Sequence, residues 1–577
     1  MVKKAKAASA VGLLLAALVT GVFLSGYLVL LFLGLHDVPI GWDTYWRYAS
    51  ALDLAQVAPF ATKIKLAGGL GFGLPVLLWL ALTFALFKPR QQSIHGDARF
   101  ATRADLKKAG LLDDSPEGIV IGRFGRDLLR LGGTQHVIMT APTRTGKTTG
   151  VAIPVLLTYG HSIVAMDLKG ELYQLTSGWR ARQGQKIRVF APYDEAGRTH
   201  RFNPFQMMSG DPRIRISEIQ TIGAILYPDA PHKDPFWTNQ SRTAFFAFAS
   251  YLFEHWDHMV RQLVDQVAAP ELTLDPNTDP RFPSFERIYK LSAGSGGKDT
   301  KALIQHILQG SEHAFTSEVT RTAFRSVVSL AEQTFSSVIG SMQEPLQQFL
   351  SPILAAATNA SDFNVATLRK EPTTIYVVIP PDKLGEASKL LNIFFSTVVG
   401  QNLRVTPQED KLIKNQLLLL LDEFTAMGRV DVLSKRISLT AGYWVRDLSI
   451  IQSLSQLDST YGADEARTYI TNHAASIVFT PREQRDAEEY SRQLGDTTVR
   501  RRNRTVGQGG TSYSHTEERR ALMLPQELKA LGTEEELIFL EGCPPIRCSK
   551  IRYFKDPLFK KRVLPKVEIE PAEQSQG

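Results

Sequence analysis

The stretch His136–Leu157, which reads HVIMTAPTRTGKTTGVAIPVLL, decides the fold class of this chain. Its first five residues are mostly apolar and predict a short buried strand, and the apolar run from Val151 to Leu157 predicts a helix. The loop between them matches a Walker A phosphate loop in the strand–loop–helix context that the motif requires. The stretch therefore predicts an α/β nucleotide-binding domain.

The residues of this loop are the predicted nucleotide contacts. Backbone N–H groups of such a loop cradle phosphates, and its lysine reaches the β- and γ-phosphates. The threonine that follows the lysine supplies a hydroxyl to Mg²⁺. Ala141 stands where the motif usually has its first glycine. We predict ATP and Mg²⁺ as cofactors, held by Ala141, Pro142, Thr143, Arg144, Thr145, Gly146, Lys147, Thr148 and Thr149.

A second part of the site is predicted far downstream, in the sequence QLLLLLDE at Gln416–Glu423. A hydrophobic strand that ends in two acids is typical of a Walker B motif. We predict that Asp422 holds Mg²⁺ together with Thr148, and that Glu423 orients and polarises the attacking water. With Lys147, these two acids are predicted to be catalytic.

Two further apolar runs end in polar residues. Ser162–Met166 is followed by Asp167, and Asp447–Ile451 is followed by Gln452. Gln452 could sense the γ-phosphate or place the water, and a plain surface glutamine is the alternative. Parallel strands that end in polar residues indicate a doubly wound sheet with its ligand at the carboxyl edge.

The spacing of the two Walker motifs predicts an inserted domain. About 270 residues separate them, far more than one crossover needs. Residues 207–362 read as helical and largely lack strand patterns, whereas 374–379 reads as a strand again. We therefore predict a nucleotide-binding domain in two parts, 91–206 and 363–560, an all-α insertion at 207–362, and a polar tail at 561–577.

The N-terminal 90 residues are predicted to form a membrane anchor. No charged residue occurs from Ala7 to Leu35 or from Leu66 to Phe87, so spans are predicted at about 11–35 and 66–87. A signal peptide is the alternative for the first stretch, but its apolar region is usually shorter. Cationic residues flank both spans, and the positive-inside rule places them and the bulk of the chain in the cytoplasm. These residues are Lys3, Lys4, Lys6, Lys88 and Arg90.

Composition adds weaker constraints. The chain has 577 residues, too many for one core, and a formal net charge of +8. That charge permits a polyanionic partner, but flanking lysines and a solvated surface explain it equally well. Only two cysteines occur, Cys543 and Cys548, which indicates free thiols in a reducing compartment.

Several motifs together resemble those of the type IV secretion coupling proteins, the TraG/TraD-like ATPases of conjugation and effector export. The resemblance spans nearly the whole chain. It implies two transmembrane helices, a RecA-like domain with an inserted all-α domain, and a hexameric ring with ATP sites at subunit interfaces. The motifs that carry it are His95–Thr102, Ala141–Lys147, Asp167–Glu171, Phe202–Phe205, Asp234–Trp237, Leu421–Phe424, Ile451–Leu457 and Ile546–Phe554.

The same resemblance implies a trans-acting arginine that stabilises charge on the transferring phosphoryl group of a neighbouring subunit. Arg429, Arg436 and Arg446 lie between Glu423 and Gln452 and are the candidates. Arg446 is preferred because it enters the strand that ends at Gln452.

Two other patterns are less specific. Arg500–Arg504 precedes a glycine-rich stretch and predicts either a basic loop for DNA or another anion, or an ordinary exposed hairpin tip. His255 and His258 have a spacing that a metal could use, but no further ligand supports that reading, so a solvated helix face is expected.

The function predicted from these features is that of an inner-membrane ATPase that feeds cargo to a type IV secretion channel. The cargo would be a relaxase bound to single-stranded DNA or a protein effector, and the partners would be channel subunits and five further copies of the chain. Two alternatives remain open. One is an FtsK-like DNA translocase, and the other is a cargo-docking platform that uses ATP mainly for assembly.

Overall fold

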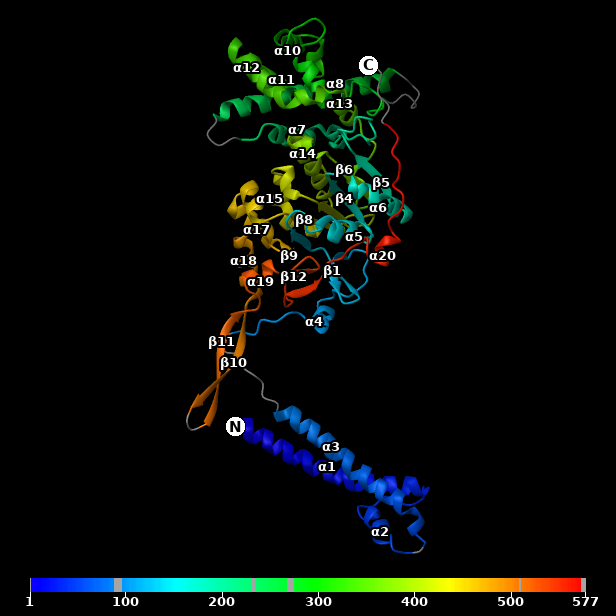
Figure 1. The fold of residues 1–577 in the computed structure, drawn as a ribbon. Coiled ribbons are helices and arrows are strands. Elements are labelled where there is room, and N and C mark those ends of the chain that lie inside the picture. The colour runs from blue at the N-terminus through cyan, green and yellow to red at the C-terminus, as the bar shows by residue number, and fades with distance from the viewer. Residues whose placement is uncertain are drawn as a thin grey trace. The chain divides into compact units, whose positions relative to one another are not determined.

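The computed structural model describes residues 2–54, 56–87, 96–229, 234–266, 274–507 and 510–571, and it divides into two compact units, 1–94 and 95–577 (Figure 1). Lys88 and Arg90, which were predicted to flank the second span, lie outside the described residues, as does the end of the polar tail.

The N-terminal unit is a pair of long apolar helices with a short helical connection. Its elements are α1 (Val2–Leu33), α2 (Thr44–Ser50), η1 (Ala58–Phe60) and α3 (Ala61–Phe87). By length and composition, Ser9–Leu33 and Ala58–Ala85 could each cross a membrane. The second helix starts before the uncharged stretch, and Lys63 Nζ near its start donates to Phe32 O at 3.0 Å.

The close approach of α3 to α1 occurs at Gly71 and not at the pair Gly69 and Gly73. Gly69 and Gly73 are four residues apart, which could be a packing face or merely a glycine-rich helix. A Cβ at either would meet nothing within 4 Å among the described residues, whereas a Cβ at Gly71 would collide with Ser25 of α1. Among the described residues, Gly69 and Gly73 therefore do not form the contact between α1 and α3.

The larger unit is built on one eleven-stranded sheet with the order β2-β1-β13-β12-β9-β3-β8-β7-β4-β6-β5. The seven strands from β9 to β5 are parallel, and the four at the other edge are antiparallel. Their bounds are β1 (Ile119–Phe124), β2 (Asp127–Leu131), β3 (His136–Thr140), β4 (Ser162–Asp167), β5 (Lys186–Phe190), β6 (Thr373–Val378), β7 (Leu417–Leu421), β8 (Val445–Ile451), β9 (His473–Val478), β12 (Glu535–Leu540) and β13 (Ile546–Ser549).

Both faces of this sheet are buried, as the uniformly apolar strands require. In β7, Leu417, Leu419 and Leu421 belong to one core, whereas Leu418 and Leu420 belong to the core on the opposite face. The helices outside residues 207–362 are α4 (Arg103–Lys108), η2 (Thr148–Ala152), α5 (Ile153–Leu156), α6 (Glu171–Arg182), η3 (Pro204–Met207), η6 (Val365–Thr367), η7 (Pro381–Lys383), α14 (Leu384–Asn402), η8 (Phe424–Met427), α15 (Asp431–Thr440), η9 (Ala441–Tyr443), α16 (Leu454–Tyr461), α17 (Ala463–Thr471), α18 (Gln484–Leu494), α19 (Pro525–Lys529) and α20 (Pro557–Lys560). The predicted α/β class is confirmed.

Between β5 and β6 the chain is helical, and the described residues of 207–362 form no named strand. These helices share one continuous core with a face of the sheet. The exact bounds 207 and 362 therefore stay a prediction. The helices are α7 (Pro212–Leu226), α8 (Pro235–Gln266), α9 (Phe285–Ser292), α10 (Thr300–Gln309), η4 (Ser311–Ala314), α11 (Glu318–Val328), α12 (Glu332–Gln343), η5 (Glu344–Leu350) and α13 (Pro352–Thr358).

A separate two-stranded ribbon, β10 (Asp496–Gly507) and β11 (Gly510–Ala521), follows α18. The arginines of 500–504 lie along strand β10 rather than in a loop at its tip. Arg500 is cross-strand to Glu517 and pairs with it at 2.8 Å. The stretch is therefore part of a hairpin strand.

Candidate nucleotide site

The predicted site residues follow strands β3, β7 and β8, which are adjacent and parallel. The carboxyl ends of parallel strands meet at one edge of a sheet, where doubly wound folds bind their ligands. The phosphate loop leaves β3 at Thr140, the two acids leave β7 at Leu421, and Gln452 follows Ile451 of β8. The topology thus brings together segments nearly 300 residues apart.

The phosphate loop has the backbone that its residue types predict. Gly146 has φ +86°, a left-handed conformation that glycine adopts without strain, and Arg144 adopts φ +63° at an exposed position. Thr145 Oγ1 donates to Pro142 O at 2.6 Å and closes the turn. Ala141 is fully buried and donates its N–H to Ile451 O at 2.9 Å. Alanine in place of the usual first glycine is therefore accommodated.

Thr148 and Asp422 form the candidate metal position. Thr148 Oγ1 donates to Asp422 Oδ2 at 3.0 Å, and the buried Asp422 Oδ1 has no hydrogen-bond partner among the described residues. Burial raises the pKa of this carboxyl, while the nearby Lys147 ammonium opposes that rise. An unpaired carboxylate oxygen beside a hydroxyl suits Mg²⁺, which takes its other ligands from water and phosphate. The residues present fit this ion.

Glu423 is held at the centre of the site by two predicted partners. Lys147 Nζ contacts its Oε1, and Gln452 Nε2 donates to its Oε2 at 2.8 Å. Glu423 itself has φ +59°, which is rare for a residue with a side chain and costs of order 1–3 kcal/mol. Lys147, Glu423 and Gln452 thus form one connected group, as the sequence predicts for residues that act on one phosphate.

The residue after Glu423 connects the site to a buried polar cluster that sequence reasoning missed. The Phe424 ring stacks on Tyr461 and Tyr469, with centroids 5.5 and 5.1 Å away. Tyr469 donates its hydroxyl to Asp447 Oδ2 at 2.5 Å, and His473 Nε2 lies 2.7 Å from Asp447 Oδ1. No sequence motif indicates that Asp447, Tyr469 and His473 are in contact, because they lie in β8, α17 and β9.

The preferred candidate for the trans-acting arginine is wrong. Arg446 is fully buried, at 0% exposure, and cannot reach a neighbouring subunit. Its guanidinium donates to the backbone carbonyls of Glu117, Leu131 and Gln135 at 2.6, 3.1 and 2.9 Å. These contacts fix the turn before β3 and the edge of β2. Arg446 is therefore a structural residue.

The other two candidates remain exposed. Arg429 pairs with Asp431 and Glu465 at 2.5 and 2.6 Å and lies over the Tyr461 ring. Arg436 is exposed on α15. Either could face another subunit, and the identity of the trans-acting residue stays a prediction.

Two arginines that the sequence did not single out contact the phosphate loop. Arg482 donates to Thr143 O at 3.0 Å and to Thr143 Oγ1 at 3.4 Å. Arg552 lies so close to Gly146 that a Cβ there would collide with its Nη1. Arg482 has no sequence signal beyond its position shortly after β9. Arg552 comes shortly after β13 and lies within Ile546–Phe554, one of the stretches that carry the family resemblance.

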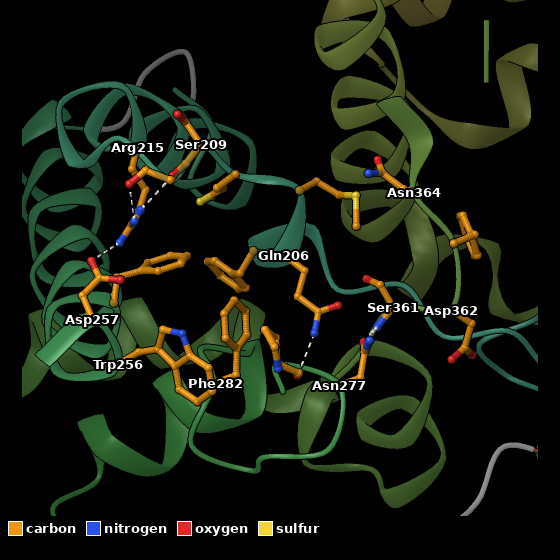
Figure 2. Close-up of a pocket in the computed structure, with 17 residues that line it drawn as sticks. Gln206, Ser209, Arg215, Trp256, Asp257, Asn277, Phe282, Ser361, Asp362 and Asn364 are labelled. Atoms are coloured by element: carbon orange, nitrogen blue, oxygen red, sulfur yellow. Dashed lines mark hydrogen bonds and ion pairs between the residues drawn. The ribbon is translucent and has the colours of Figure 1, made fainter. Parts of the chain in front are cut away.

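A separate cavity of about 560 Å³ contains none of the predicted site residues (Figure 2). Aromatic rings line it, including Trp256 and Phe282, and a buried Arg215 closes one side. Arg215 is fully engaged, with Asp257 at 2.8 Å and the carbonyls of Ser209 and Gly210 both at 3.1 Å. The His255 and His258 side chains pack against Phe315 with ring centroids 5.8 and 4.5 Å away. The described residues contain no group of three or more His, Cys, Asp or Glu side chains that could hold a metal ion.

Solved structures show the same fold. The chain is similar to the plasmid coupling protein TrwB in complex with ADP and Mg²⁺, with a TM-score of 0.56 and 16% identity over 84% of this chain and 98% of that one. The bacterial conjugative coupling protein TrwB in complex with sulphate also gives 0.56 at 16% identity, over 84% and 98%. The predicted RecA-like architecture is thereby confirmed.

Curated relatives and a family profile extend the likeness to sequence. Protein VirD4 of Rhizobium rhizogenes is 27% identical over 510 residues, which covers 85% of this chain and 70% of that protein. Conjugal transfer protein TraG of Escherichia coli is 27% identical over 530 residues, covering 81% and 78%. Residues 95–577 match the family described as Type IV secretory system Conjugative DNA transfer. The chain therefore belongs to this family, the coupling proteins of type IV secretion.

Proposed function

We propose that this chain is an inner-membrane, Mg²⁺-dependent ATPase that recruits cargo and drives it into a type IV secretion channel. The observation that carries this proposal is the meeting of Lys147, Thr148, Asp422, Glu423 and Gln452 at one edge of the sheet. A lysine, a hydroxyl, two acids and an amide in this arrangement can bind a nucleoside triphosphate and activate a water molecule.

The hydrolytic step follows from the partners of Glu423. A triphosphate competes with this carboxylate for the Lys147 ammonium, and the freed carboxylate is then available to a water molecule. Glu423 accepts the proton of that water as its oxygen attacks the γ-phosphorus and the bond to the β,γ-bridging oxygen breaks. Gln452 keeps the carboxylate oriented through its 2.8 Å hydrogen bond.

Thr148 and Asp422 would hold Mg²⁺. When bound, this ion supplies positive charge to the phosphate oxygens as the terminal phosphoryl group transfers. The two side chains contribute the hydroxyl oxygen and the unpaired Asp422 Oδ1.

The N-terminal helices would anchor the protein in the membrane as two spans. Side chains that a soluble helix pair would bury are exposed, with Leu77 at 63% and Phe84 at 77%. Burying apolar surface is worth about 25 cal/mol per Å², so a lipid environment stabilises this pair. The bulk of the chain would then lie in the cytoplasm, as the charge asymmetry predicts.

Assembly and partners are further parts of this proposal. A homo-hexamer would place an exposed arginine of one subunit, Arg429 or Arg436, against the nucleotide of the next. Cargo would be a relaxase bound to single-stranded DNA or a protein effector. Stimulation of ATP hydrolysis by single-stranded DNA, lost as salt rises, would favour the DNA cargo.

The test is Lys147→Ala in the full chain, with Lys108→Ala as a control at an exposed lysine of α4. ATP hydrolysis by purified protein and cargo transfer in cells are measured for both variants. We expect Lys147→Ala to lose both activities and the control to keep both. Transfer at the wild-type rate without hydrolysis would refute the motor and favour the docking platform.

A further inference from the structure

Arg552 lies on the phosphate loop, although 405 residues separate it from Lys147 in the chain. A Cβ added to Gly146 would collide with Arg552 Nη1 and lie 3.1 Å from Thr149 Oγ1. The neighbouring Ile551 O lies 3.3 Å from a Cβ position at Gly150. The segment after β13 therefore packs along the loop and the first turn of the helix that follows it.

Contacts of Nη2 with Thr533 and Glu534 hold the Arg552 guanidinium in place. Arg552 Nη2 donates to Thr533 O at 2.6 Å, and the Glu534 carboxylate lies 3.8 Å from the same nitrogen. The side chain is only 16% exposed. This leaves the Nη1 edge directed at Gly146, with a geometry fixed by a backbone carbonyl rather than by a flexible partner.

Positive charge gathers at this point of the molecule. The Arg552 guanidinium adjoins the residue that precedes Lys147, and the backbone N–H groups of the loop form a cradle of partial positive charge. Like charges at short range repel, and a polyanion relieves that repulsion.

Arg482 also contacts the phosphate loop, but it differs from Arg552 in two ways. Its side chain is exposed, and its guanidinium donates to the Thr143 oxygens.

We infer that Arg552 is a nucleotide-binding residue that acts in cis and donates to the α-phosphate. This inference rests on the proposed ATPase function. In a phosphate loop the lysine reaches the β- and γ-phosphates and the following hydroxyl serves the metal, so the loop's N–H groups are left for the inner phosphates. Arg552 adjoins Gly146, beside Thr149 Oγ1. Lys147 and Thr148 instead contact Glu423 and Asp422, the carboxylates that mark the γ-phosphate end.

The experiment measures the dissociation constants of ATP and ADP with fluorescent analogues of each, on the full chain in detergent. The variants are Arg552→Gln, Arg552→Lys and a matched control, Arg547→Gln, in β13 of the same segment. Arg547 pairs with Glu535 at 2.6 Å on the surface. Lys147→Ala serves as the reference for loss of the site.

Loss of a hydrogen bond from a charged donor predicts weaker binding by about 10- to 100-fold in Arg552→Gln. The factor should be equal for ATP and ADP, because both carry the α-phosphate, and kcat at saturating ATP should stay within about twofold. Arg552→Lys should recover part of the affinity, and Arg547→Gln should bind as the wild type does.

Unchanged affinity in Arg552→Gln would overturn this inference, and so would a loss confined to ATP, which would place the contact at the γ-phosphate. A fall in kcat without any change in affinity would also overturn it, since it would place the contact of Arg552 in the transition state rather than with the bound nucleotide. If the wild-type chain itself binds neither nucleotide, the proposed function fails instead, so the two failures are distinguishable.

Discussion

Replacing Arg446 by alanine separates a structural arginine from a catalytic one. The variant would leave the backbone carbonyls of Glu117, Leu131 and Gln135 without the donors that now lie 2.6–3.1 Å away. Each lost bond to a charged donor is worth about 1.5–3 kcal/mol, and the cost of burying the charge itself is recovered in part. We expect a net loss of roughly 3–5 kcal/mol.

The assay is thermal unfolding of the full chain, followed by intrinsic fluorescence. For a cooperative unit as long as residues 95–577, the entropy of unfolding is of order 1 kcal/mol per kelvin, so the midpoint should fall by about 3–5 °C. Arg436→Ala, at an exposed position on α15, should change stability by less than about 0.5 kcal/mol. An Arg446→Ala protein that unfolds at the wild-type temperature yet hydrolyses no ATP would refute our reasoning and restore Arg446 as a catalytic candidate.

Three further predictions follow from single contacts. Burial raises the pKa of Glu536 to about 8 from an ordinary 4.5, so the unfolding free energy should fall as pH rises between these values. Glu536→Gln should remove that slope and stabilise the chain by roughly 3 kcal/mol at pH 7, measured by unfolding across pH; an unchanged slope would contradict the assignment. Phe424→Leu should lower kcat about tenfold with little change in KM for ATP, because it removes the stacking on Tyr461 and Tyr469 that supports Glu423; equal kinetics would show that the stack does not position the carboxylate. Thr148→Val should raise the Mg²⁺ concentration needed for half-maximal hydrolysis by about tenfold or more, whereas Thr148→Ser should not, and identical Mg²⁺ titrations would remove Thr148 from the metal position.

The phosphate loop and the two acids could be predicted because short, contiguous sequence motifs specify them. A short apolar strand, a loop ending in Gly146–Lys147 and an apolar helix specify a phosphate loop without reference to distant residues. The five leucines before Asp422 predict a strand buried on both faces, and the acids that follow it must then lie at the strand's end. Parallel pairing of those strands brings Gln452 to the same edge.

The roles of Arg446 and Arg552 could not be predicted, because they depend on tertiary packing between segments that are far apart in the sequence. Arg446 stands in a strand whose seven residues are all buried, and only the packing of the turn before β3 reveals why a charge is tolerated there. Arg552 reaches Gly146 because β12 and β13 join the sheet beside β9 as antiparallel strands. No local pattern specifies that arrangement, since antiparallel edge strands can be added at either side of a parallel sheet.

The most direct test of the account is the behaviour of Glu423→Gln, because it separates binding of ATP from its hydrolysis. Bound ATP, the rate of hydrolysis and cargo transfer are measured for the same full-length variant. The account predicts wild-type or tighter ATP binding, hydrolysis reduced about 10²- to 10⁴-fold, and loss of transfer. Normal hydrolysis in this variant would contradict the role of Glu423, and normal transfer without hydrolysis would contradict the claim that ATP hydrolysis drives the cargo.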